Sequence, residues 1–426
     1  MPKYFVQFIH LVLLILFLMD LPVHAQHNPE NYFTYLENTF NEHDKSLQDL
    51  LIDELSHFLI LFPDDQNAGR VQYMLASVYR RKNKKQEALA GYLKMIYLYP
   101  SSAVIAANKD DLRSLIANER AFSDQQEWLK SLIDQDYSKL PPDEAFLKYL
   151  ETMVKLEKPG LEDWNLASCR EFFRRFPNDS HHDQVLLWMA DIYTMSKDYE
   201  ETNSTYSKFA VLFSDSPHLV NILYEQGELY YKRLRQPEKA IDILTQVVNN
   251  YPDSALAGGA LFTIAEIKEK KQKDYTGAIA DYQQVVEKYP DNEKSVEALW
   301  QIAEIYERNQ KDYRAAASSY NEIVEKYPGN SKGVEALEKM AGVYTSKIED
   351  YSLAVQTYAK IAELYPDYEK APDRLIDAGS VCEKQLQDYN QASTYYQMVL
   401  DNYPDSPKTK EASKKLEKVQ KKLSGN

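Results

Sequence analysis

The sequence DYRAAASSYNEIVEKYP at residues 312–328 has a close copy 38 residues earlier, DYTGAIADYQQVVEKYP at residues 274–290. The closing Tyr-Pro pair occurs five times at this same interval, as Tyr251-Pro252, Tyr289-Pro290, Tyr327-Pro328, Tyr365-Pro366 and Tyr403-Pro404. A fixed period of this length is typical of a stacked repeat array. The sequence therefore predicts that one structural unit, repeated and stacked, builds this part of the chain.

Each unit carries the pattern of two helices. Asp312 is a good N-cap, and Ala316 and Tyr320, four residues apart, share one face of the helix that follows. Pro328 ends that helix because proline disfavours the helical conformation in the residue before it. An earlier helix is indicated by an apolar stripe with steps of three and four residues, Ala298, Leu299, Ile302, Ala303 and Tyr306. We expect a helix hairpin in every unit.

Seven residues of this unit fall in the order of the tetratricopeptide repeat (TPR) pattern: Leu299, Ile302, Ala303, Tyr306, Ala316, Tyr320 and Pro328. The chain thus resembles TPR proteins. The resemblance implies an all-α, right-handed α-solenoid of stacked hairpins, in which the first helices line a concave, peptide-binding groove. The long units closing on Tyr-Pro-Asp are similar to those of bacterial envelope proteins, namely the TolA-binding periplasmic proteins and the outer-membrane assembly lipoproteins.

Carried backwards, the period predicts ten hairpins, ending near residues 62, 99, 137, 176, 213, 251, 289, 327, 365 and 403. The alanine and tyrosine positions are lost between Ala103 and Leu140, and Pro141-Pro142 and Pro159-Gly160 interrupt the pattern. Such dipeptides are turn signals, and they mark either ordinary turns between helices or a flexible break between two rigid blocks. We expect partly degenerate hairpins over residues 26–177 and a regular array over residues 178–404.

Residues 405–426 form a basic tail. From Lys408 to Leu423 the sequence is amphipathic and carries seven lysines against two glutamates. Because the last repeat of an array needs a polar outer face, this pattern predicts a capping helix. A basic helix on an acidic body could alternatively contact an anionic membrane surface or an acidic partner.

The N-terminus has the pattern of a secretory signal peptide over residues 1–25. Lys3 precedes an apolar run from Tyr4 to Met19, and Val23-His24-Ala25 supplies a small-residue cleavage site before Gln26. The run is also short for a bilayer span, which needs about 20 apolar residues. We therefore expect an exported, periplasmic protein, with retention of the segment as a membrane anchor as the alternative.

Composition and motifs bear on the class of ligand. A formal net charge of −15 argues against nucleic acid, because phosphate binding needs a basic surface. The sequence contains no phosphate-binding loop, nucleophile elbow, zinc-protease motif or Cys-x-x-Cys pair. Cys169 and Cys382 lie more than five repeats apart, too far for a disulfide in a stacked array. His181-His182, the one histidine pair, sits in a turn sequence. We expect no enzymatic activity, cofactor or metal.

A second set of residues repeats on the first helices. Tyr224, Phe262 and Trp300 are 38 residues apart, and Glu228, Glu266 and Glu304 each follow four residues later. Residues four apart share a helix face, so stacked first helices would present an aromatic row beside a carboxylate row. We call these six residues the ladder. Either the ladder lines a partner-binding groove, or its aromatics fill space between neighbouring helices.

Together these patterns predict an exported, non-enzymatic TPR scaffold that binds a partner protein or peptide with basic and apolar residues, in assembly or organisation of the bacterial cell envelope. A membrane-associated architectural spacer, linking copies of itself or envelope complexes, is the alternative. A saccharide-binding role of the aromatics is disfavoured, because stacking rings without catalytic groups do not specify it.

Overall fold

The computed structural model describes residues 28–425, and no strand occurs in them. The chain divides into two compact units, one reaching to Ser214 and the other beginning at Asp215. We call these the N-terminal and C-terminal units. The predicted signal peptide lies outside the described residues. Within residues 28–425, no helix is both long and apolar enough to cross a membrane.

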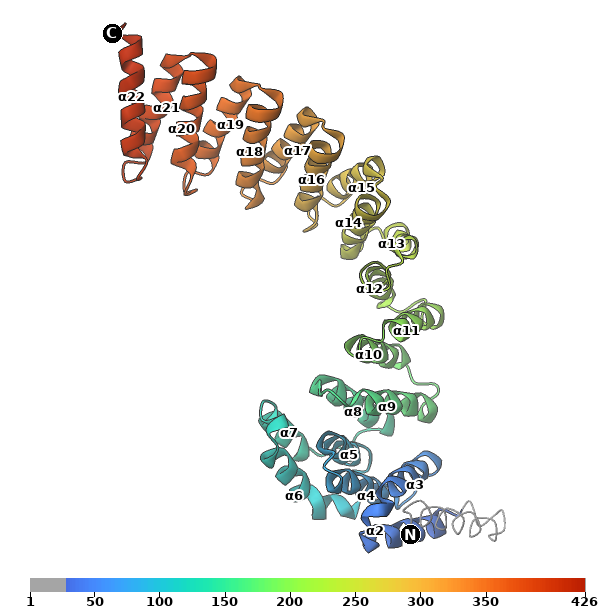
Figure 1. Ribbon diagram of the computed structural model, residues 1–426. Coiled ribbons are helices and arrows are strands. Elements are labelled where there is room, and N and C mark those ends of the chain that lie inside the picture. Colours follow the sequence, from blue (N-terminus) through green and yellow to red (C-terminus); the bar gives the residue numbers. More distant parts are fainter. Residues whose placement is uncertain (1–27, 426) are drawn as a thin grey trace, which may run out of the picture. The chain divides into compact units, whose positions relative to one another are not determined.

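The C-terminal unit is a stack of antiparallel helix pairs followed by one last helix (Figure 1). Its helices are α12 (Leu219–Lys232), α13 (Pro237–Asn250), α14 (Ala255–Ile267), α15 (Tyr275–Lys288), α16 (Ser295–Glu304), α17 (Tyr313–Lys326), α18 (Lys332–Val343), α19 (Tyr351–Leu364), α20 (Ala371–Val381), α21 (Tyr389–Asn402) and α22 (Thr409–Leu423). Even-numbered members are the first helices of the pairs and odd-numbered members are the second helices. This arrangement is the TPR-like solenoid expected from the period.

The second helices form for the reasons that the repeat predicts. In α17 the Asp312 side chain accepts a hydrogen bond from the Ala315 amide at 3.0 Å, and Asp274, Asp350 and Asp388 cap their helices in the same way. Ala316 and Tyr320 are completely buried. Tyr327 ends the helix, its amide bonded to the Ile323 carbonyl. The predicted capping, packing and termination are therefore confirmed.

Four of the first helices end in a π-helical turn that the sequence analysis did not anticipate. These turns span Lys268–Gln272, Ile305–Gln310, Tyr344–Ile348 and Cys382–Leu386. Each is followed by one residue with a left-handed backbone: Lys273, Lys311, Glu349 and Gln387, with φ between 54° and 59°. None of the four is glycine, the residue that adopts this conformation most readily. The first helix thus runs one wide turn further before the chain reverses.

The N-terminal unit contains α2 (Pro29–Glu42), α3 (Gln48–Leu61), α4 (Ala68–Arg81), α5 (Lys85–Leu98), α6 (Ala103–Asn118), α7 (Gln126–Ile133), α8 (Pro142–Leu156), α9 (Glu162–Arg175), α10 (His182–Met195) and α11 (Tyr199–Leu212). Short 3₁₀ turns cover Lys45–Leu47 and Arg120–Phe122. With the five pairs of the C-terminal unit, these helices complete the ten predicted hairpins. Pro142 begins α8 and Pro159-Gly160 lies in the turn before α9, so both dipeptides are turns between helices.

The third hairpin, α6 and α7, departs from the regular stack. α7 has 8 residues, whereas the second helices around it have 14. The fourth hairpin therefore reaches back to α5: the Tyr97 hydroxyl lies 2.8 Å from that of Thr152 in α8, and Lys94 pairs with Glu171 of α9 at 2.5 Å. All ten residues from Ala88 to Tyr97 are buried. α5 is thus a central helix enclosed on every side, which explains why its sequence from Ala88 to Tyr97 is apolar apart from the paired Lys94.

The predicted capping helix is α22. It buries Ala412, Leu416 and Val419 against the preceding pair. Lys418 and Lys422 donate to Glu383 at 2.9 and 3.2 Å. Part of the basic charge of the tail therefore neutralises a carboxylate, Glu383, at the end of the solenoid.

Candidate protein-interaction surface

The ladder residues lie on three successive first helices of the C-terminal unit, α12, α14 and α16. Tyr224 is half-buried, but Phe262 and Trp300 are only 9% and 8% exposed. Each of the buried rings packs on a tyrosine of its own hairpin: Phe262 on Tyr282 with ring centroids 5.2 Å apart, and Trp300 edge-on to Tyr320 at 5.3 Å.

The outer faces of these two rings are covered by lysines of the next repeat. The Lys294 ammonium lies 5.8 Å from the centre of the Phe262 ring, and that of Lys332 lies 5.1 Å from the centre of the Trp300 ring. Lys332 also pairs with Glu297 of the preceding first helix. The cations expected from a partner are thus supplied by the solenoid itself, which favours the packing alternative for Phe262 and Trp300.

The ladder carboxylates are more accessible than these two rings. The side chains of Glu228, Glu266 and Glu304 are 12%, 23% and 21% exposed. Each forms an ion pair with a cation one turn later on its own helix, respectively Lys232, Lys270 and Arg308. Glu228 also accepts a hydrogen bond from Thr263 of the next first helix at 2.8 Å. The surface therefore presents a carboxylate row beside a cation row.

A second set of carboxylates lies inside the hairpins. Glu269 and Glu307 accept hydrogen bonds from Tyr282 and Tyr320 at 3.0 Å, and Glu383 accepts one from Tyr396 at 3.4 Å. Burial raises the pKa of Glu269, although the bond from Tyr282 opposes the shift. The spacing of these glutamates by 38 and 76 residues was visible in the sequence, but nothing local linked them to the tyrosines.

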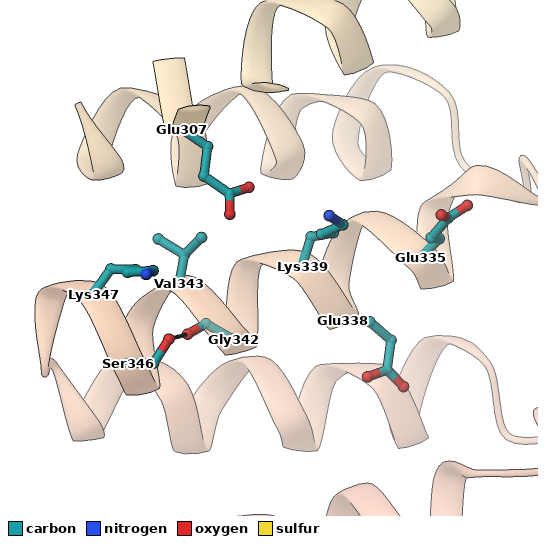
Figure 2. Close-up of a pocket in the computed structure, with 8 residues that line it drawn as sticks. All are labelled: Glu307, Glu335, Glu338, Lys339, Gly342, Val343, Ser346 and Lys347. Atoms are coloured by element: carbon teal, nitrogen blue, oxygen red, sulfur yellow. Dashed lines mark hydrogen bonds between the residues drawn. The ribbon is translucent and has the colours of Figure 1, made fainter. Parts of the chain in front are cut away.

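The repeated rows end at α18. Glu338 replaces the aromatic, Gly342 replaces the carboxylate and Ser346 replaces the cation. A pocket of about 330 Å³ opens here, lined by Glu307, Glu335, Glu338, Lys339, Gly342, Val343, Ser346 and Lys347. Figure 2 shows Glu307 extending from the neighbouring helix toward Val343, across the pocket. A Cβ built on Gly342 would meet no atom within 4 Å, so the space beside this residue is open.

The described residues contain no group of three or more histidine, cysteine or carboxylate side chains that could hold a metal ion. His181 bonds to Asp179 of its own turn, and His182 to the Phe176 carbonyl. Both cysteines are buried and form no disulfide, and burial raises the pKa of Cys169 to about 12 and that of Cys382 to about 11, which keeps the thiols protonated and unreactive.

Comparison with known proteins agrees with a TPR-like fold. A model of the tetratricopeptide repeat matches residues 70–102 and 380–406, and a model of the soluble NSF attachment protein family matches residues 185–332. No curated protein sequence matches significantly.

Three solved structures illustrate the likeness to known folds. A tetratricopeptide repeat protein from Parabacteroides merdae is 17% identical, over 65% of this chain and 98% of that chain, with a TM-score of 0.35. The C-terminal part of a TPR repeat-containing protein from Cytophaga hutchinsonii is 16% identical, over 62% and 98%, with a TM-score of 0.37. PilW, a type IV pilus biogenesis factor, is 15% identical, over 57% and 100%, with a TM-score of 0.30.

Proposed function

From this TPR-like solenoid we propose a non-enzymatic scaffold that binds a partner protein or peptide across the first helices of its C-terminal unit. The observation that carries the proposal is the break at α18. The first helices α12, α14 and α16 carry rows of paired charge, and the rows end at α18, where the pocket at Gly342 takes the place of the next pair. A partner lying across these helices would insert an apolar side chain there, over Val343, and hold it in one register.

Charge supports the choice of partner. Each ladder carboxylate has one cation, yet a carboxylate accepts several hydrogen bonds, so Glu228, Glu266 and Glu304 retain acceptor capacity. A partner with Lys or Arg residues would use that capacity. The net charge of −15 would also speed its arrival, an effect that salt weakens.

The test compares matched variants in a pull-down from extract of the source cells, followed by titration of the recovered partner. Gly342→Phe fills the pocket without a clash at its Cβ, and the triple change of Glu228, Glu266 and Glu304 to Gln removes the carboxylate row. We expect each to weaken binding at least tenfold. Changing Glu238, Glu287 and Glu363 to Gln, three exposed carboxylates on second helices, should leave affinity unchanged. Equal loss in the control, or none with Gly342→Phe, would exclude this surface.

The cell envelope is proposed as the site of action on the N-terminal sequence, from Lys3 through Val23-His24-Ala25. Intact-mass measurement of the native protein should give a chain that begins at Gln26 and fractionates without detergent. A retained N-terminus and a need for detergent would instead favour the membrane-associated spacer.

A further inference from the structure

A second cavity, of about 640 Å³, lies in the N-terminal unit between α3, α4 and α9. The cavity forms because the third hairpin, α6 and α7, departs from the regular stack. Because α8 and α9 reach back to α5, the exposed side of α9 comes to face α3 and α4. A volume of this size is in the range of sites that hold a drug-sized ligand or a few residues of peptide.

One wall of the cavity is aromatic and fixed. Trp164 packs edge-on against Tyr79 with ring centroids 5.6 Å apart. The Trp164 indole donates a hydrogen bond of 2.6 Å to the Tyr149 hydroxyl, which holds the ring in place. Ile60, at 49% exposure, provides an apolar surface on the α3 side. These three side chains form a rigid apolar site for a hydrophobic group.

A buried acceptor lines the same cavity. Gln72 is 1% exposed, and its Nε2 donates to the Gly91 carbonyl at 3.2 Å, which fixes the orientation of the amide. Its Oε1 accepts no hydrogen bond from any residue of the described chain. Buried polar atoms are paired in the great majority of cases, so an unpaired one calls for a specific explanation. A ligand that donates an N–H group would satisfy this oxygen.

The remaining charge on the cavity wall is positive. Lys94 pairs with Glu171, and Lys84 pairs with Glu87 at 3.4 Å. Of the other charged residues that line the cavity, Arg170 and Arg174 are positive and only Asp163 is negative. The Arg174 side chain is exposed and forms no ion pair within residues 28–425. In a chain with a net charge of −15, this local excess suits a carboxylate.

We propose that this cavity binds a short acidic segment of a partner polypeptide. An apolar side chain of the segment packs on Trp164 and Tyr79, a backbone N–H donates to Gln72, and a carboxylate pairs with Arg174. The site is separate from the surface on the C-terminal unit and takes a ligand of the opposite charge. It does not depend on the function proposed above.

The experiment selects random displayed hexapeptides on the full-length protein. We expect enrichment of sequences in which an acidic residue stands next to an apolar one. Binding of a synthetic copy should fall at least tenfold with Arg174→Glu and with Ile60→Asp, two changes at exposed positions. It should be unaffected by Lys208→Glu, an equal change of charge on α11, outside the cavity.

Titration of the selected peptide against Gln72→Leu isolates the buried acceptor. We expect at least a fivefold loss of affinity with helical content unchanged. No enrichment of acidic sequences, or a selected acidic peptide that binds Arg174→Glu as well as the parent protein, would each overturn the proposal. None of these outcomes affects the surface on the C-terminal unit, because the variants lie in the other unit.

Discussion

At the scale of single residues, the left-handed positions after the π-helical turns carry a small strain. Lys311 has φ of 57°, a conformation that costs a residue with a Cβ roughly 1–2 kcal/mol. Lys311→Gly removes this strain from the folded state but makes the unfolded chain more flexible, which costs stability. The relief of strain should be the larger effect, so the change should stabilise the protein by up to about 1 kcal/mol. Thermal unfolding followed by circular dichroism measures this. Lys370→Gly, at φ of −94°, is the control and should not stabilise.

For Trp300 of the ladder, a packing role and a partner-binding role predict opposite effects of substitution on stability. Its ring is enclosed by Tyr320 and Lys332, so Trp300→Ala should reduce the free energy of unfolding by about 3–5 kcal/mol, as for other buried aromatics. Denaturant titration tests this value. A loss below about 1 kcal/mol, typical of surface substitutions, would return Trp300 to the role of partner contact.

The burial of Trp300 could not be predicted from its own helix. Its spacing with Tyr224 and Phe262 indicated a shared face, and that was enough to place the three on successive first helices. Its exposure depends on Lys332, which begins the next first helix and folds over the ring. Periodicity predicts which face of its helix a side chain lies on. Whether another side chain covers it depends on the neighbouring repeat.

At the scale of elements, the attachment of α22 should depend on pH. Burial alone would raise the pKa of Glu383, but the hydrogen bonds from Lys418 and Lys422 outweigh it and hold the pKa below its usual range. With a folded pKa below the unfolded value of about 4.3, the pairing stabilises the protein fully above that pH. The stabilisation is lost as the pH falls through the folded pKa.

We therefore predict that the thermal midpoint of the parent protein falls more steeply than that of Glu383→Gln between about pH 5 and about pH 3, the range around the carboxyl pKa. Glu411→Gln, an exposed position on α22, should keep the parent slope. Parallel curves for parent and Glu383→Gln would show that these pairs do not hold the cap.

At the scale of the whole molecule, the two units should respond differently to truncation. Regular repeats contact their neighbours, so a fragment from Ser216 to Asn426 should fold alone and lose helix roughly in proportion when further repeats are removed. In the N-terminal unit, several hairpins pack against one enclosed helix, α5. A fragment of residues 28–140, which lacks α8 and α9, should therefore lose most of its helical structure. Circular dichroism of both series tests the contrast, and equal behaviour would contradict it.

This contrast also marks the limit of what the sequence predicted. The number of hairpins, the capping aspartates and the terminal helix followed from a pattern that each unit repeats locally. The enclosure of α5 did not, because it depends on Tyr97 meeting Thr152, 55 residues away, and Lys94 meeting Glu171, 77 residues away. Such pairings leave no period in the sequence, and the cavity beside Trp164 follows from them.

The enclosure of α5 has a consequence for biosynthesis. Translation completes α5 well before α8 and α9, so the nascent chain carries an apolar helix whose cover has not yet been made. Exposed apolar surface of this kind promotes aggregation and binds chaperones. Later repeats can fold against neighbours as they emerge. The first hairpins are completed only after 77 further residues, the separation of Lys94 and Glu171, have been made. The order of synthesis therefore makes the beginning of this chain, rather than its long regular array, the part that most needs protection.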